Sequence, residues 1–385
     1  PITNPQLPMP NYQSPITNPQ FPPRAFSYFC RKSIIHIIME KFKIQTEQFA
    51  DIRILRYQVP GFNDLPVKQK ELLYYLYEAA LSGRDMIYDQ NYKHNLLIRY
   101  LLEAIVATYP CDRNTGDWNN FMVYVKKVWF SNGIHHHYSM DKFVPGISKE
   151  YFVELAKSSD LSSLGASGKT DELISKIVPV IFNPELDAKR VVQDEGVDLI
   201  SGSANNFYEN VSQKEAGDFY RNLSDPDDPE PVSWGLNSKL VKEKGEIREY
   251  TWKMGGMYGK AIEKVVYWLE KAIDVAESEA QKKALEKLVE YYKTGNLKAF
   301  DEYSILWLQD QHSTVDVVNG FIEVYGDALG RKATYESVVS IRDEAATKRA
   351  ATISNNAQWF EDHSPTDPTY KKEKVEGVSA RGINV

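Results

Sequence analysis

The heptapeptide GFIEVYG, residues 320–326, is a short run bounded by glycines in which the side chains alternate in kind. Because successive side chains of an extended strand point to opposite faces, Ile322 and Val324 are predicted to share the buried face. The other face would then carry Phe321, Glu323 and Tyr325. A carboxylate held against aromatic rings is partly desolvated and favours a cationic partner, such as a peptide α-ammonium, a Lys or an Arg. On the pattern alone, an ordinary edge strand with one solvated Glu is the simpler interpretation.

The composition around this stretch is typical of a globular protein in water. The chain has 385 residues, which is too long for one compact core and predicts two or three substructures. Its net charge of -7 disfavours binding to nucleic acid or to an anionic membrane, and no apolar run approaches the ~18 residues of a membrane span. The two cysteines, Cys30 and Cys111, lie too far apart in sequence to indicate a disulfide framework, which fits a reducing, cytoplasmic location.

The first 38 residues differ from the rest of the chain. The hexapeptide PITNPQ occurs at residues 1–6 and again at 15–20, and proline is frequent throughout. Proline disfavours helix, and the segment has too little apolar content to fold alone. We therefore expect residues 1–38 to be a disordered or non-native extension.

Apolar periodicity predicts a mainly helical α+β protein. Helices are expected over 46–57, 66–90, 95–109, 118–130, 149–158, 170–177, 184–192, 212–223, 260–277, 281–293, 300–310 and 344–360. The early helices, joined by short connections, predict an antiparallel stack. Strands are expected over 197–202, 246–252, 320–326, 335–341 and 375–385, with the strand over 335–341 paired beside residues 320–326. The helix over 344–360 should turn one set of side chains inward: Ala346, Ala350, Ile353, Ala357 and Phe360.

Three adjacent histidines, His135, His136 and His137, invite a metal-binding interpretation. A tetrahedral zinc site needs ligands that converge, such as residues i and i+4 of a helix. Consecutive residues of a loop point in different directions, so at most two of these three could share an ion. A polar loop that lines a cleft is the favoured interpretation.

Several separated stretches resemble, in the right order, the dipeptidyl peptidase III family of zinc exopeptidases, which release dipeptides from peptide N-termini. They are EYTWKMGG at 249–256, IEKVVYWLEK at 262–271, WLQD at 307–310 and GFIEVY at 320–325, together with SNG at 131–133, KFVP at 142–145 and NNAQWF at 355–360. The sequences of these stretches are most similar to those of the Bacteroides-like bacterial branch. The resemblance runs from about Thr46 to the last residue.

The resemblance implies a fold of two lobes about a wide cleft. In the lower lobe, helices surround a five-stranded β-barrel, and the other lobe is helical and carries zinc. Residues 39–342 would form the lower lobe. Residues 343–385 would form the helix that crosses towards the catalytic lobe and the start of a returning strand, so the chain would end before the zinc-bearing lobe is complete.

The same resemblance assigns roles to three residues. Glu323 would bind the free α-ammonium of the peptide. Tyr325 would hydrogen-bond the peptide or the developing oxyanion. Tyr138 would form an aromatic wall of the S2 subsite. The implied partners are oligopeptide substrates with a free N-terminus.

One departure from the family pattern concerns the mechanism. The family's zinc motif, His-Glu-x-x-Gly-His, and its third Glu ligand are missing, because no His-Glu pair occurs in the sequence. Residues 382–384 match only the first half of the substrate-binding segment Gly-Ile-Asn-x-Pro-Asn. We therefore expect no catalytic residue and no metal ligand in this chain, with zinc held by a C-terminal catalytic part, and no activity from the chain alone.

Two other interpretations stay open. The chain could be a non-catalytic peptide-binding or scaffold module, or a metal-binding protein that uses His135, His136 and His137. A His-Glu-x-x-Gly-His segment encoded beyond Val385 would favour the enzyme. Zinc calorimetry on a triple-alanine variant of the histidines would test the metal-binding interpretation.

Overall fold

We analysed a computed structural model of the chain, which describes residues 42–164, 169–377 and 380–385. The predicted extension over residues 1–38 lies outside these described residues. The chain divides into two compact units, residues 1–58 and 59–385, and each unit is described by itself. No helix of the described residues is both long enough and apolar enough to cross a bilayer.

The predicted helix over 46–57 is wrong, because the first unit contains a β-hairpin at this point. The hairpin consists of two antiparallel strands, β1 (Gln45–Phe49) and β2 (Ile52–Leu55). Ala50 in the two-residue connection has a φ of 46°, a left-handed conformation that a right-handed helix does not contain. The β-branched residues Ile52 and Ile54 favour the strand locally, and this preference outweighs the apolar spacing.

The second unit begins with a short 3-10 turn and two helices: Phe62–Asp64, α1 (Val67–Ser82) and α2 (Arg84–Asn91). The fully buried side chains of α1 are Leu72, Leu76 and Ala79. The helix predicted as continuous over 66–90 is interrupted at Gly83. A Cβ at Gly83 would lie 2.1 Å from the ring of Tyr335, so the ring packs directly on the backbone at this point.

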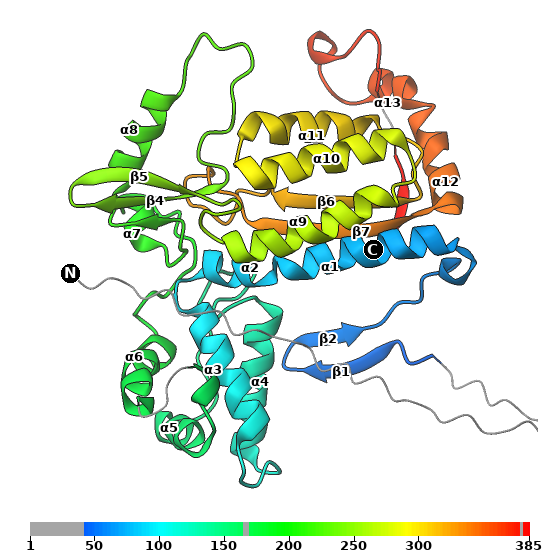
Figure 1. Cartoon of the computed structure of the whole chain (residues 1–385). Coiled ribbons are helices and arrows are strands. Elements are labelled where there is room, and N and C mark those ends of the chain that lie inside the picture. The colour runs from blue at the N-terminus through cyan, green and yellow to red at the C-terminus, as the bar shows by residue number, and fades with distance from the viewer. Residues whose placement is uncertain (1–41, 165–168, 378–379) are drawn as a thin grey trace, which may run out of the picture. The chain divides into compact units, whose positions relative to one another are not determined.

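Four helices form a stack in the lower part of Figure 1: α3 (Asn95–Thr108), α4 (Gly116–Phe130), α5 (Lys149–Ser158) and α6 (Thr170–Phe182). A 3-10 turn, Ser162–Leu164, follows α5. Thr115 and Ser148 cap α4 and α5 by accepting backbone N–H groups with their side chains, which explains where these helices begin. The buried side chains of the four helices form a hydrophobic cluster of their own. The predicted stack of the early helices is thus confirmed only for α3 and α4, because residues 45–55 form a hairpin and the buried side chains of α1 belong to another cluster.

The segment between this stack and the first sheet differs from the prediction. The predicted helix over 184–192 is wrong: Asp187 has a φ of 51°, and Lys189 forms an isolated β-bridge with Asp141. The predicted strand over 197–202 is also wrong, because this stretch forms the short helix α7 (Leu199–Gly202). The Asp198 side chain accepts the backbone N–H groups of Ile200 and Ser201, and this cap stabilises the helical turn.

The first sheet of the second unit has three strands: β3 (Tyr208–Glu209), β4 (Ser238–Glu243) and β5 (Glu246–Thr251). β3 is parallel to β4, and β4 is antiparallel to β5. Helix α8 (Gln213–Leu223) lies between β3 and β4 in sequence and begins with a capping box formed by Ser212 and Glu215. The helix predicted over 212–223 and the strand predicted over 246–252 are confirmed.

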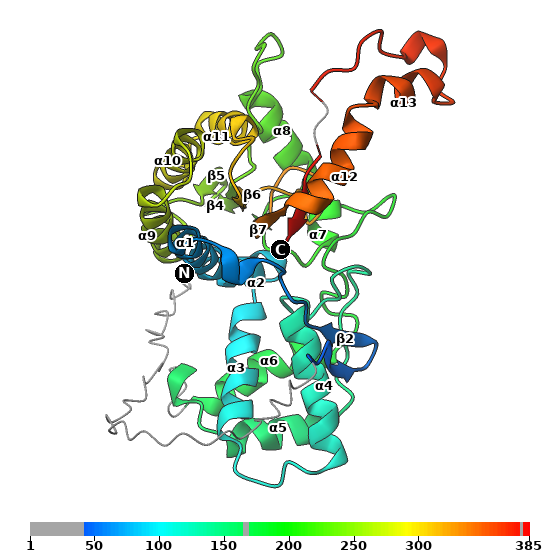
Figure 2. The same ribbon diagram turned by 90° about the vertical axis from the view of Figure 1, so that its right-hand side faces the viewer.

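Three long helices follow: α9 (Gly259–Asp274), α10 (Glu279–Thr294) and α11 (Leu297–Gln309). The apolar row of α9 is buried, as its i, i+3, i+4, i+7 spacing predicts: Ile262, Val265, Val266 and Leu269. In Figure 2, α1, α9, α10 and α11 form an arc along one side of strands β4 to β7. The main hydrophobic cluster contains buried side chains of these four helices and of the strands beside them.

The last sheet is antiparallel and has the order β6 (Val315–Phe321), β7 (Tyr335–Asp343) and β8 (Gly382–Asn384). Residues 335–341 pair with residues 315–321, so the predicted pairing with the GFIEVYG stretch holds only for Gly320 and Phe321, and the strand predicted over 320–326 ends at Phe321. The strand predicted over 375–385 is shorter than expected. Between β7 and β8 the chain forms two helices and a 3-10 turn: α12 (Glu344–Ser354), α13 (Ala357–His363) and Pro368–Tyr370.

The helix predicted as continuous over 344–360 is interrupted after Ser354. Two of its predicted inward side chains are exposed, Ile353 by 62% and Phe360 by 49%. The contact of α12 with β8 is made in its first turns, where Ala346 and Thr347 lie against Gly382. Periodicity indicates which side chains share a face, but not how far a neighbouring element extends along that face.

Candidate functional site

The GFIEVYG stretch lies at the end of β6, and the strand itself ends at Phe321, two residues before Glu323. Phe321 is opposite Tyr335 on β7 and is fully buried, with its ring centroid 4.8 Å from that of Trp252. The prediction that Phe321 shares the exposed face with Glu323 is therefore wrong, and the carboxylate is not flanked by two rings. Glu323 itself is exposed.

A bulge in the pairing explains this change of face. The Ile322 N–H donates to the carbonyl oxygen of Thr334 at 3.0 Å, and the Thr334 N–H donates to the carbonyl oxygen of Glu323 at 2.9 Å. Two residues on one strand thus oppose a single residue on the other, which is the defining pattern of a β-bulge. The extra residue resets the alternation of faces, so Glu323 is exposed although Phe321 is buried.

A second carboxyl group, that of Glu336 on β7, lies within hydrogen-bonding reach of the Glu323 carboxylate. Burial and the nearby negative charge of Glu323 together raise the pKa of Glu336 to about 7. The Thr334 hydroxyl is 3.4 Å from the Glu336 carboxylate and partly opposes this shift in pKa. The two carboxyl groups form a negatively charged pair that a bound cation would stabilise.

The Tyr325 side chain, 60% exposed, lies next to this pair. Partial burial raises the pKa of the Tyr325 hydroxyl, the charges of Glu323 and Glu336 raise it further, and the guanidinium of Arg190 acts in the opposite direction. The hydroxyl therefore stays protonated at neutral pH and can donate a hydrogen bond.

Arg190 is a buried cation, only 6% exposed. Its Nη1 donates to Oδ1 of Asn91 at 2.8 Å, and its Nη2 and Nε donate to the sulfur of Met140 at 2.9 and 3.2 Å. Within the part of the chain that the structure describes, no carboxylate pairs with this guanidinium. Burial lowers the pKa of Arg190, and the charge that the Tyr325 hydroxyl carries when ionised opposes this shift.

Tyr138 lies in an exposed loop, and its side chain is 83% exposed. Its ring centroid is 4.6 Å from that of His137. Met140, two residues further on, connects this loop to Arg190, whose backbone N–H donates to the Met140 carbonyl oxygen at 2.8 Å. Among the described residues no hydrogen bond or ring contact joins Tyr138 to Glu323 or Tyr325.

His135 and His136 have different hydrogen-bond partners. His135 is buried; its Nε2 donates to the carbonyl oxygen of Asp187 at 2.8 Å, and burial lowers its pKa to about 4. His136 accepts the backbone N–H groups of Tyr138 and Ser139 at Nδ1, both at 3.1 Å. Over residues 42–164, 169–377 and 380–385, no group of three His, Cys, Asp or Glu side chains converges to hold a metal ion. The described residues therefore do not fit the zinc that the family resemblance implies, and we derive no step through it.

Sequence reasoning missed two members of this site, Glu336 and Arg190. Glu336 could have been found, because the strand over 335–341 was predicted to pair with the GFIEVYG stretch and its second residue is acidic. Arg190 could not have been found, because its segment was predicted as a helix. Its position depends on contacts with Asn91 and Met140, which are distant in sequence.

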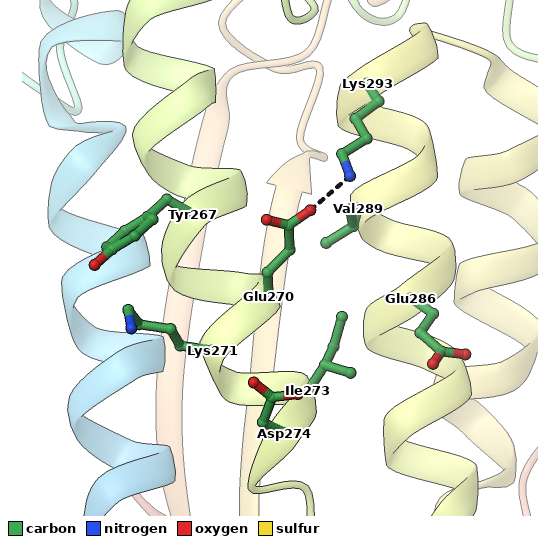
Figure 3. A pocket seen from close by; sticks show the side chains of 8 residues that line it. All are labelled: Tyr267, Glu270, Lys271, Ile273, Asp274, Glu286, Val289 and Lys293. Carbon is green, nitrogen blue, oxygen red and sulfur yellow. Dashed lines mark hydrogen bonds and ion pairs between the residues drawn. The ribbon is translucent and has the colours of Figure 1, made fainter.

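A separate hollow lies between α9 and α10 and is shown in Figure 3. Its lining includes Glu270 and Lys293, which form an ion pair at 2.6 Å. None of the three predicted substrate-binding residues, Glu323, Tyr325 and Tyr138, lines it. We therefore place the candidate functional site at Glu323.

The comparisons with known proteins cover this part of the chain. Residues 236–379, which include Glu323, Tyr325 and Glu336, match the family model described as peptidase family M49. Dipeptidyl peptidase 3 of Homo sapiens is 30% identical over 119 residues, 31% of this chain and 16% of the human protein. Dipeptidyl peptidase 3 of Nematostella vectensis is 21% identical over 364 residues, 81% of this chain and 48% of that protein. The solved structure of dipeptidyl-peptidase III from Corallococcus sp. strain EGB has a similar fold, with a TM-score of 0.56 and 18% identity over 85% of this chain and 49% of that one.

These matches show that residues 236–379 are similar to peptidase family M49 and that the chain is similar to dipeptidyl peptidase III proteins. The solved structure shows the likeness of the fold. The chain spans less than half the length of the curated relatives described above.

Proposed function

We propose that this chain supplies the substrate-anchoring lobe of a zinc-dependent dipeptidyl peptidase, which removes dipeptides from the N-termini of oligopeptides. One observation carries the proposal: within the region that matches the family, a bulge exposes the Glu323 carboxylate beside that of Glu336, next to the Tyr325 hydroxyl. An α-ammonium is the cation that every unblocked peptide has at its N-terminus.

The chemistry at this site is recognition. The ammonium donates hydrogen bonds to Glu323, and its positive charge favours the ionised form of Glu336. Tyr325 donates its hydroxyl proton to a carbonyl oxygen of the peptide near the same end. Tyr138 would provide an aromatic wall further along the peptide.

The remaining parts of the proposal extend beyond the described residues. Zinc would be held by a C-terminal catalytic part that completes the second lobe. Residues 39–342 would belong to the lower lobe with its five-stranded barrel, and residues 343–385 to the crossing into the other lobe. We place the chain in the Bacteroides-like bacterial branch because of the sequences of its motifs. We place it in the cytoplasm because of its cysteine content. We propose no nucleic-acid or membrane partner.

The alternative is a non-catalytic peptide-binding or scaffold module. It would bind peptides with a free N-terminus through Glu323 and would have no catalytic part. Both proposals require Glu323 to bind a peptide N-terminus, and they differ in catalysis. An assay of the purified chain with a dipeptidyl arylamide and added zinc should show no hydrolysis, and the same assay after adding a catalytic part should show hydrolysis under the enzyme proposal alone.

Peptide binding tests the feature that the two proposals share. We expect tetra-alanine with a free N-terminus to bind the purified chain in a calorimetric titration. The same peptide with an acetylated N-terminus should bind at least about ten-fold more weakly, because a charge-assisted hydrogen bond contributes about 1.5–3 kcal/mol. Equal binding of the two peptides would contradict the proposed anchoring role.

A further inference from the structure

One side chain, that of Gln90 near the end of α2, holds the backbone on both sides of Thr334. Gln90 is fully buried. Its Nε2 donates to the carbonyl oxygen of Ala333 at 3.1 Å, and its Oε1 accepts the backbone N–H of Tyr335 at 2.9 Å. A side-chain amide carries both a donor and an acceptor, as a peptide group does, so Gln90 takes the place of a neighbouring strand at this edge.

The opposite edge of the same short stretch forms the bulge. There the N–H and the carbonyl oxygen of Thr334 bond to the backbone of Glu323 and Ile322. Strand β8 pairs with β7 over residues 341–343, at the far end of that strand. At residues 333–335 the bonds to the first edge come from Gln90. The bulge is therefore held between Gln90 on one edge and the GFIEVYG stretch on the other.

Both acidic residues of the candidate site depend on the position of Thr334. Its N–H and hydroxyl donate to the Glu323 carbonyl oxygen, and the same hydroxyl lies 3.4 Å from the carboxylate of Glu336. Glu336 also follows directly after Tyr335, which Gln90 binds. A shift of the backbone over residues 333–335 would thus move both carboxyl groups.

Gln90 is itself fixed by the segment that holds the end of the GFIEVYG stretch. The Gln90 carbonyl oxygen accepts the backbone N–H of Asn206 at 2.9 Å. The preceding residue, Asn205, donates its side-chain amide to the carbonyl oxygen of Gly326 at 3.1 Å. Helix α2 and residues 205–206 therefore support the candidate site from both sides of the bulge.

We propose that Gln90 is a positioning residue of the ammonium site, whose side-chain amide sets the backbone at Thr334 and thereby the placement of the Glu323 and Glu336 carboxyl groups. This inference rests on the proposed function for the identity of the ligand. It adds a residue, outside the region that matches the family model, that determines how strictly the site distinguishes a charged peptide N-terminus from a blocked one. Displacements of less than about 1 Å are sufficient, because hydrogen bonds near 2.9 Å are lost beyond about 3.5 Å.

The first test follows the titration of Glu336 and needs no ligand. Gln90→Met keeps the length of the side chain and removes both hydrogen bonds. Burial and the charge of Glu323 raise the pKa of Glu336 to about 7, and both causes weaken when the two carboxyl groups separate. Carboxyl-carbon NMR should therefore show the midpoint of Glu336 falling by at least about one pH unit in the variant. An unchanged midpoint would overturn the role of Gln90.

The second test measures recognition of the peptide N-terminus. Calorimetric titrations would compare tetra-alanine with N-acetyl-tetra-alanine. The preference for the free N-terminus should be at least about ten-fold in the unaltered chain and should fall below about three-fold in Gln90→Met. An equal preference in the two chains would overturn the proposal. If the unaltered chain shows no preference, the proposed function fails, and the Glu336 midpoint still decides whether Gln90 positions the carboxyl pair.

Gln281→Met is the matched control. Gln281 lies on α10, is 6% exposed and also makes two hydrogen bonds with its amide: Nε2 donates to the Val315 carbonyl oxygen at 2.7 Å, and Oε1 accepts the Glu277 N–H at 2.9 Å. Val315 lies at the other end of β6 from the candidate site. This variant should lose a similar amount of stability but keep both the peptide preference and the Glu336 midpoint. A control that loses them as Gln90→Met does would reduce Gln90 to a structural role and overturn the proposal.

Hydrogen exchange of the unaltered chain decides if Gln90→Met does not fold. Because linkage is reciprocal, binding of tetra-alanine should slow exchange of the Tyr335 amide, which donates to Gln90. It should leave exchange of the Glu277 amide, which donates to Gln281, unchanged. No slowing at Tyr335, or equal slowing at both amides, would overturn the role of Gln90.

Discussion

Thr334 holds the backbone of Glu323 through two hydrogen bonds to one carbonyl oxygen, from its N–H at 2.9 Å and from its hydroxyl at 3.2 Å. The same hydroxyl lies 3.4 Å from the carboxylate of Glu336. Thr334 therefore holds the backbone of Glu323 and contacts the carboxylate of Glu336, at the bulge that exposes Glu323. The proposed ammonium site would thus be positioned in part by the backbone.

Replacing Thr334 by Val should remove the hydroxyl and keep the shape. We expect a loss of about 1 kcal/mol in the free energy of unfolding, the usual contribution of one hydrogen bond, and a several-fold weaker affinity for tetra-alanine. Urea denaturation and calorimetric titration would measure the two effects. Thr334→Ser, which keeps the hydroxyl, is the control and should retain the affinity. A Val variant that binds as tightly as the unaltered chain would show that the hydroxyl is dispensable.

Stability should fall as pH rises through the range in which Glu336 ionises. Its pKa is about 7 in the folded chain and 4.5 in the reference state, so the folded state binds the extra proton in this window. Glu336→Gln removes the free-energy cost of ionising this partly buried carboxyl group in the folded chain. It should therefore raise the free energy of unfolding above pH 7 by on the order of 1 kcal/mol, a figure reduced for solvent screening. The gain should vanish towards pH 4.5.

Denaturant unfolding at several pH values would measure this gain. Glu263→Gln, at an exposed position on α9, provides the control and should show no such trend. A gain for Glu336→Gln that is independent of pH would contradict the assignment.

Peptide binding should release protons near neutral pH. An ammonium placed against Glu336 stabilises its ionised form, so the bound peptide lowers a pKa that is about 7 in the free chain. Calorimetric titrations in buffers of different ionisation enthalpy would count the protons, and we expect release of up to about half a proton at pH 7. Proton uptake, or the same release in Glu336→Gln, would argue against contact between the ammonium and Glu336.

The interruption between α1 and α2 provides a prediction about the fold. Gly83→Ala would place a Cβ 2.1 Å from the Tyr335 ring and should destabilise the chain by about 1–3 kcal/mol, as overpacking of a core usually does. Gly217→Ala is the control, because nothing lies within 4 Å of its Cβ, and it should stabilise α8 by about 0.5–1 kcal/mol. Thermal unfolding of both variants measures the difference, and equal midpoints would mean that the close packing of Tyr335 is not needed.

Much of the fold could be predicted from local patterns. The apolar row of α9 and the boundaries of α5 follow from periodicity and capping, which are properties of neighbouring residues. The segment over 184–192 and the hairpin over 45–55 were mispredicted, because left-handed residues at Asp187 and Ala50 carry no clear sequence signal.

The candidate site could also be predicted only in part, because local patterns indicate exposure but do not encode contacts between distant residues. The alternation of GFIEVYG indicates that Glu323 is exposed, and the structure agrees. It assigns Phe321 to the wrong face, since a bulge depends on the opposite strand and on Thr334. Arg190 is a member of the site only through long-range contacts, and no local pattern encodes them.

The central claim is that Glu323 binds the α-ammonium of a peptide. A double-mutant cycle tests it most directly, by measuring the affinity of tetra-alanine and N-acetyl-tetra-alanine for the unaltered chain and for Glu323→Gln. We predict a coupling free energy of at least about 1.5 kcal/mol, because each change alone removes the same interaction. Additive effects, with a coupling within about 0.3 kcal/mol of zero, would contradict the assignment of Glu323.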